Sequence, residues 1–153
     1  MSATVVSLHI APAAAAPLTE VGEVRAVAGR GLEGDRYFLG TGKYTKVPGS
    51  GRNVTLIESE ALEAAKRDYA LEFTPGETRR NLVTRGIALN HLVGKEFTVG
   101  TARLRGTRLC EPCNYWQELC GKPRARESLV HRGGLRCEIV ADGVIKAGDA
   151  IVV

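Results

Sequence analysis

The chain lacks any apolar run long enough to cross a membrane, although 44% of its 153 residues are hydrophobic. A membrane-spanning helix needs roughly 20 consecutive apolar residues. The apolar N-terminal segment MSATVVSLHIAPAAAAPL also lacks the basic residues that precede the hydrophobic region of a secretory signal. We therefore expect a cytoplasmic protein with no membrane partner, and the four cysteines are expected to be reduced thiols.

Aromatic residues are also scarce. They make up 5% of the chain, which argues against a surface on which the bases of a single-stranded nucleic acid stack. Charge is unevenly distributed, because residues 77–153 contain 13 Lys and Arg against 8 Asp and Glu, whereas residues 1–76 contain 8 against 9. This bias suits an anionic partner such as a phosphate-bearing cofactor, or is simply a solvated basic face. Nucleic acid is not expected as a partner, because charge alone supports it.

Short segments rich in β-branched residues recur along the chain and predict about eight to ten strands. The segment ESEALEAAKRDYAL (58–71) has apolar residues at helical spacing and predicts the one clear helix, while CNYWQELCG (113–121) could begin a second, shorter one. Strands do not alternate regularly with helices, so a parallel doubly wound sheet is not expected. The sequence predicts a single domain over residues 1–153, mainly β with one or two helices, folded as a barrel or sandwich.

One glycine motif imitates a dinucleotide-binding fingerprint. Gly29, Gly31 and Gly34 in GRGLEG match the pattern G-x-G-x-x-G, and a predicted strand precedes them. The following DRYFLGTGKY shows no helical period, and the acidic residue expected about 20 residues beyond the strand is missing. We therefore predict a turn that presents Asp35 and Arg36.

The cysteines permit several interpretations. Cys110 and Cys113 form a single C-x-x-C pair, whereas structural zinc is often held by two such pairs. A thioredoxin-like redox pair would need a βαβ setting, which the strand-rich pattern does not predict. Cys137 lies in an alternating strand, where a free cysteine is usually a small buried apolar residue. The remaining interpretation is one functional thiol on a loop, with nearby arginines favouring its anion.

Two basic segments are candidates for anion binding. In ETRRNLVTRG, the consecutive Arg79, Arg80 and Asn81 supply many donors suited to phosphate, although they could equally form a basic strand end in water. In HRGGLRCEIV, basic residues flank a Gly-Gly turn, which could be an ordinary hairpin. Neither a Ser-His-Asp order nor an H-E-x-x-H motif stands out.

Taken in order, the segments GLEGDRYF, NVTLIESEAL, RRNLVTRGIALNHLVGKEFTVG, LCEPC and DGVIKAGDAIVV resemble a stand-alone MOSC domain, a module named for the C-terminal part of eukaryotic molybdenum cofactor sulfurases. The resemblance spans about Val5 to Val153 and implies a mixed β-barrel. For some members it implies a molybdenum–pyranopterin cofactor and reduction of N-hydroxylated compounds such as amidoximes, hydroxylamines or N-hydroxylated bases, with electrons from an external reductase. For others a sulfur-carrier role is inferred, with a cysteine persulfide formed by a cysteine desulfurase.

The resemblance also implies site residues. It places the catalytic cysteine, which ligates molybdenum, at Cys113. The cofactor contacts that it implies are Arg79, Asn81, Arg52, Asn53, Arg36, Arg136 and Pro112. Relatives with a fused N-terminal β-domain carry a Lys-Ser pair in their first loop that touches the cofactor, but here the comparable residues are Ala11 and Pro12.

Overall fold

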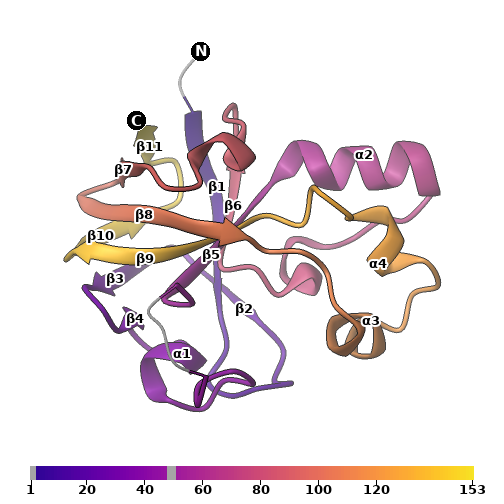
Figure 1. Ribbon diagram of the computed structural model, residues 1–153, viewed down its shortest axis with the longest axis horizontal. Helices are drawn as coiled ribbons and strands as arrows, with labels where there is room; N and C mark the ends of the chain where they lie inside the picture. The colour runs from indigo at the N-terminus through magenta and orange to yellow at the C-terminus, as the bar shows by residue number, and fades with distance from the viewer. Residues whose placement is uncertain (1–2, 48–50) are drawn as a thin grey trace.

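The computed structural model describes residues 3–47 and 51–153, and its main feature is a closed barrel of seven strands (Figure 1). Around the barrel the order is β11 (Ala150–Val152), β7 (Glu96–Val99), β8 (Ala102–Leu109), β9 (Leu135–Ala141), β5 (Val54–Glu58), β6 (Leu82–Arg85) and β1 (Ala3–Ile10). Pairing of β1 with β11 closes it. Neighbours β5 and β6 are parallel and the other pairs antiparallel, so the mixed β-barrel expected from the sequence is confirmed.

The barrel forms because apolar residues alternate with polar ones along its strands. In β8, Ala102 and Leu104 are buried in the interior, whereas Arg103 and Arg105 point outward and pair with acidic side chains. Cys137 of β9 is also part of this interior, as its alternating strand predicts. Beside the barrel lie β2 (Thr19–Val21), which pairs with β1, and a small sheet of β10 (Gly143–Lys146), β3 (Glu23–Val27) and β4 (Gly31–Leu32).

Three helices gather on one side of the barrel, where they enclose a second apolar cluster (Figure 1). They are α2 (Ser59–Tyr69), α3 (Asn114–Cys120) and α4 (Ala125–Ser128). The chain also contains two 3-10 turns, η1 (Pro75–Thr78) and η2 (Leu89–Leu92). The cluster includes Trp116 of α3, whose ring lies 5.6 Å from that of Phe73 and whose Nε1–H donates to the carbonyl of Glu77 at 2.8 Å. This packing fixes α3 against η1 and so places the start of α3.

The structure corrects one expectation at the glycine motif. A helix does follow Gly34, namely the four-residue α1 (Arg36–Leu39), although the sequence pattern predicts none. The carboxylate of Asp35 accepts from the backbone N–H of Tyr37 at the start, and Gly40 adopts a left-handed conformation at the end. A helix of a single turn is too short to produce a hydrophobic period in the sequence. The only sequence signals for α1 are therefore its capping residues. The preceding β3 and β4 are antiparallel, so the arrangement is still not a dinucleotide-binding unit.

Within the described residues, no helix has the length and apolar character needed to cross a membrane.

Candidate functional site

A pocket lies where the loop after α1, the turn before β6 and the segment between β8 and α3 meet. Its charged lining residues are strongly unbalanced, with one carboxylate, Glu111, against six cations. The cations are Arg36, Lys43, Arg52, Arg79, Arg80 and Arg136. The remaining lining includes Tyr37, Tyr44, Tyr115 and Trp116, and also Cys110 and Cys113. Such a lining suits an anionic organic molecule.

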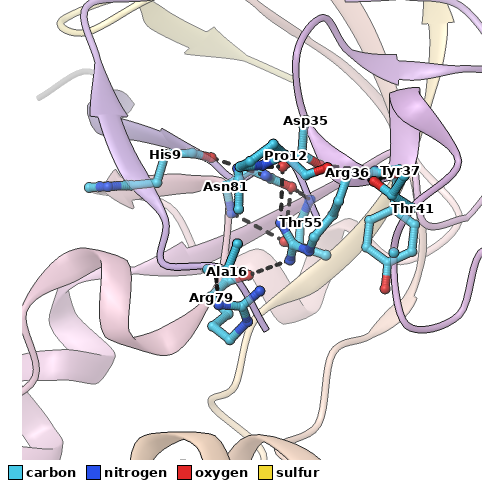
Figure 2. Close-up of polar contacts among 12 residues, drawn as sticks. His9, Pro12, Ala16, Asp35, Arg36, Tyr37, Thr41, Thr55, Arg79 and Asn81 are labelled. Atoms are coloured by element: carbon cyan, nitrogen blue, oxygen red, sulfur yellow. Dashed lines mark hydrogen bonds and ion pairs between the residues drawn. The ribbon is translucent and has the colours of Figure 1, made fainter. Parts of the chain in front are cut away.

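The first loop and the turn before β6 are joined by a polar network, which Figure 2 shows. The fully buried Asp35 accepts from the backbone N–H of Ala11 at 3.1 Å and from Nη1 of Arg36 at 2.9 Å. Nη2 of Arg36 donates to the carbonyl of Arg79 at 3.1 Å. Asp35 therefore binds both the backbone of Ala11 and the guanidinium of Arg36, which in turn reaches the backbone of Arg79.

Arg79 is held in a strained backbone conformation with a φ of 62°, and its Nη1 donates to the carbonyl of Ala16 at 2.6 Å. Burial lowers the pKa of Arg79, and the positive charge of Arg36 lowers it further. The charges of Arg36 and Arg79 thus repel each other where Arg79 is partly desolvated, which is unfavourable without a counterion. An anion at this end of the pocket would relieve that repulsion.

Two asparagines expected at the cofactor are instead used within the protein. The amide of Asn81 donates to the carbonyl of His9 at 3.0 Å and accepts from the backbone N–H of Thr55 at 3.1 Å, thereby bridging two strands (Figure 2). Asn53 is buried and accepts from the N–H of Ile139 at 3.1 Å. Among the described residues, neither asparagine lines this pocket, nor does the buried Pro112. These three residues therefore lie outside the pocket lining, and the two asparagines bond the backbone of neighbouring strands.

Cys113 occupies the N-cap position of α3, but its thiol makes no capping hydrogen bond. It is half-buried, and the hydroxyl of Tyr44 lies 4.0 Å from its Sγ. Burial raises the pKa of Tyr44, and the neighbouring Cys113 raises it further, so the phenol stays protonated and can donate towards the sulfur. Cys113 therefore presents an available thiol to the pocket.

Arg52 completes the wall on this side. Its guanidinium lies over the ring of Tyr44, 5.5 Å from the centroid. Its Nε atom is buried and has no hydrogen-bond partner among residues 3–47 and 51–153. An unsatisfied buried donor costs about 1–3 kcal/mol, so this atom is a ready donor to a bound anion.

Arg80, by contrast, uses its whole guanidinium as a structural support. It donates to the carbonyls of Gly133 at 2.7 Å, Cys110 at 2.9 Å and Thr78 at 3.1 Å. A side chain at Gly133 would lie 2.5 Å from the Cys110 oxygen and 2.9 Å from Pro112, so the Gly-Gly turn lets this backbone approach closely. The sequence predicts either an anion-binding segment or an ordinary hairpin at this turn, and the pair of glycines before a strand is the signal for the close approach.

Replacing Arg80 by Met is expected to lower the free energy of unfolding by about 3 kcal/mol, because three carbonyls lose their donor at about 1 kcal/mol each. Urea denaturation followed by circular dichroism measures this loss. The matched control is Arg103→Met, whose exposed ion pair with Glu96 contributes less than about 1 kcal/mol. Equal losses in the two variants would contradict the supporting role of Arg80.

The other cysteines form no metal site within the described parts of the chain, where no group of three His, Cys, Asp or Glu side chains is placed to hold an ion. All four cysteines are free thiols. Burial raises the pKa of Cys137, which keeps it protonated in the barrel interior. Cys110 is buried and lines the pocket near Cys113. The C-x-x-C pair is thus neither a zinc knuckle nor a disulfide in this structure.

The model of the MOSC domain family matches residues 34–152 of the chain, which is most of its length. The chain belongs to the MOSC domain family. Among curated proteins, no sequence match is found.

Solved structures share the MOSC fold at low sequence identity. The YuaD protein of Bacillus subtilis superposes with a TM-score of 0.81 at 17% identity, covering 99% of this chain and 94% of its own. YiiM of Geobacillus stearothermophilus gives 0.75 at 18% identity, covering 98% and 74%, respectively. YiiM of Escherichia coli gives 0.72 at 19% identity, covering 99% and 69%. These likenesses agree with the barrel described above.

Proposed function

We propose that this MOSC protein binds a molybdenum–pyranopterin cofactor and reduces N-hydroxylated compounds such as amidoximes, hydroxylamines or N-hydroxylated bases. The observation that carries the proposal is the thiol of Cys113, which is half-buried, makes no capping hydrogen bond and is set in a pocket whose described lining has six cations and one carboxylate. A soft thiolate suits molybdenum, and the cations suit the phosphate of the pterin.

The residues present fit such a group. Cys113 would supply the metal ligand, and the guanidiniums of Arg36 and Arg79, which both line the pocket, would hold the phosphate. The unsatisfied Nε of Arg52, whose guanidinium lies over the ring of Tyr44, offers a further donor. When bound, the cofactor supplies the two-electron reduction of an N–O bond. The electrons come from an external reductase, since the sequence carries no flavin, haem or iron–sulfur signature.

The protein's own residues orient these partners and control access. The hydroxyl of Tyr44 contacts the sulfur of Cys113, and Tyr44 lines one side of the pocket. Tyr37 and Tyr115 add aromatic walls that would accommodate a small organic substrate. Arg80 and Gly133 fix the Cys110–Pro112 backbone, so the thiol is held by a well-supported segment.

Metal and pterin analysis tests this proposal. Protein expressed in molybdenum-replete cells is expected to contain about one molybdenum and one pterin per chain and to reduce benzamidoxime with a chemical electron donor. Arg79→Gln is expected to lower pterin content by about tenfold, because a charge-assisted contact to phosphate is lost. Wild-type protein that contains neither molybdenum nor pterin would overturn the proposal.

A second candidate function is a sulfur carrier, favoured by the same accessible thiol of Cys113. In this case a cysteine desulfurase would be the partner, and a persulfide would form on Cys113 without any metal. Intact-mass analysis after incubation with a desulfurase and cysteine distinguishes the two. A reducible gain of about 32 Da on wild type, absent from Cys113→Ser, would support the sulfur carrier.

A further inference from the structure

A pair of unneutralised arginines lies next to the pocket, on two strands of the barrel wall. Arg108 of β8 and Arg136 of β9 are partners in register, and Arg136 lines the pocket. Like charges at opposite positions of an antiparallel pair repel each other. Neither arginine forms an ion pair with any residue that the structure describes.

Two other arginines of β8 differ from Arg108 because each has an acidic partner. Arg103 and Arg105, on the same strand, lie 2.7 Å from Glu96 and 2.9 Å from Glu138, respectively. The strand therefore neutralises its basic residues away from the pocket and leaves Arg108 unneutralised beside it. The unneutralised pair of arginines lowers stability and forms no ion pair with the described residues. We take this as an indication that an external anion binds there.

At the register shift between Gly106 and Arg108, Thr107 lies next to the segment that contains a third arginine, Arg52. The Thr107 hydroxyl donates to the carbonyl of Arg136 at 3.0 Å and lies 3.4 Å from that of Gly51, the neighbour of Arg52. Arg52 in turn lies over Tyr44, whose hydroxyl contacts Cys113. Thr107 thus links the register pair Arg108 and Arg136 to the segment that carries Arg52, and Arg52 and Arg136 both line the pocket. The proposed function assigns Arg36 and Arg79, rather than Arg108 and Arg136, to the pterin phosphate.

We propose that the substrates of this protein are N-hydroxylated compounds that carry a separate anionic group, a phosphate or a carboxylate, and that Arg108 and Arg136 bind that group. This inference rests on the proposed function. The N–OH group takes two electrons from the external reductase and two protons, so that the N–O bond breaks, water leaves and the amine or amidine remains. The anionic group is unchanged, and its contact with the arginines orients the substrate towards Cys113.

Matched pairs of substrates test the inference in molybdenum-loaded protein. One pair is an N-hydroxylated adenine nucleoside and its monophosphate, and the other is benzamidoxime and its para-carboxylate. The anionic member of at least one pair is expected to have a kcat/KM about tenfold higher than its neutral partner. In Arg108→Gln/Arg136→Gln this ratio is expected to fall close to one, whereas the ion-paired Arg103→Gln keeps the wild-type ratio. Which pair responds distinguishes phosphate from carboxylate.

Binding and cofactor content provide readouts besides activity. By calorimetry, the reduced monophosphate is expected to bind wild type about tenfold more tightly than its nucleoside, and the double variant is expected to lose this preference. Equal kcat/KM within both pairs would overturn the inference and leave the proposed function intact. A double variant that loses its pterin would overturn it too, because Arg108 and Arg136 would then hold the cofactor. No turnover of any of the four compounds by loaded protein would overturn the inference together with the proposed function.

Discussion

Substitution of Cys113 by Ser is expected to lower both the molybdenum content and the kcat/KM for N-hydroxylated substrates by more than about a hundredfold, because even residues that only support a metal ligand can contribute that much. The thiol is half-buried and makes no capping bond, so its loss should leave the fold intact. Metal analysis and steady-state kinetics measure the effect, and circular dichroism checks the fold.

Cys120→Ser is the matched control, because Cys120 ends the same helix, is similarly half-buried and does not line the pocket among its described residues. It should keep the molybdenum content and activity of wild type. Equal molybdenum in Cys113→Ser and wild type would show that the thiol is not the ligand. It would leave the persulfide test to decide whether Cys113 carries sulfur instead.

Substitution of Gly134 by Ala is expected to lower the free energy of unfolding by about 4 kcal/mol, because a strained backbone and an overpacked contact add together. Gly134 has a φ of 112°, and its new Cβ would overlap the carbonyl oxygen of Leu56 in β5. The carbonyl of Gly134 also accepts from the N–H of Cys110 at 2.7 Å. A shift at Gly134 would therefore loosen the segment that leads to Cys113.

Gly148→Ala separates the two causes. Gly148 also has a left-handed φ, of 91°, but a side chain there would meet nothing within 4 Å. Its substitution should cost only the backbone strain, about 1 kcal/mol. Urea denaturation of both variants measures the difference, and equal losses would show that the contact with Leu56 contributes nothing.

Much of the fold follows from local patterns. The alternation in LRCEIV predicts β9 and the burial of Cys137, and the helical spacing in ESEALEAAKRDYAL predicts α2; both are confirmed. The elements without a prediction are short, such as α1, β4 and α4. They are stabilised by caps and by their neighbours in the fold, so two to four residues leave no period in the sequence.

The site is less accessible to sequence reasoning, because its polar residues look alike in the chain. In the run Arg79, Arg80 and Asn81, the three side chains have different roles. Arg79 lines the pocket, Arg80 binds three carbonyls, and Asn81 bridges two strands. Tyr44 attracts no attention as a lone tyrosine in a glycine-rich loop, yet it contacts Cys113. Which neighbours a side chain meets depends on long-range pairing.

By itself, the sequence determined the strand-rich class, the main helix and the MOSC family, because period and motif order are properties of the chain alone. Only the tertiary structure decided the different surroundings of the two cysteines in the C-x-x-C pair. The thiol of Cys113 lies near the Tyr44 hydroxyl, whereas Cys110 is buried and its backbone is close to Arg80 and Gly133. It also decided which arginines are neutralised and which are not. Closure of the barrel brings together segments more than a hundred residues apart, and charge, burial and hydrogen bonding at the site arise from that proximity.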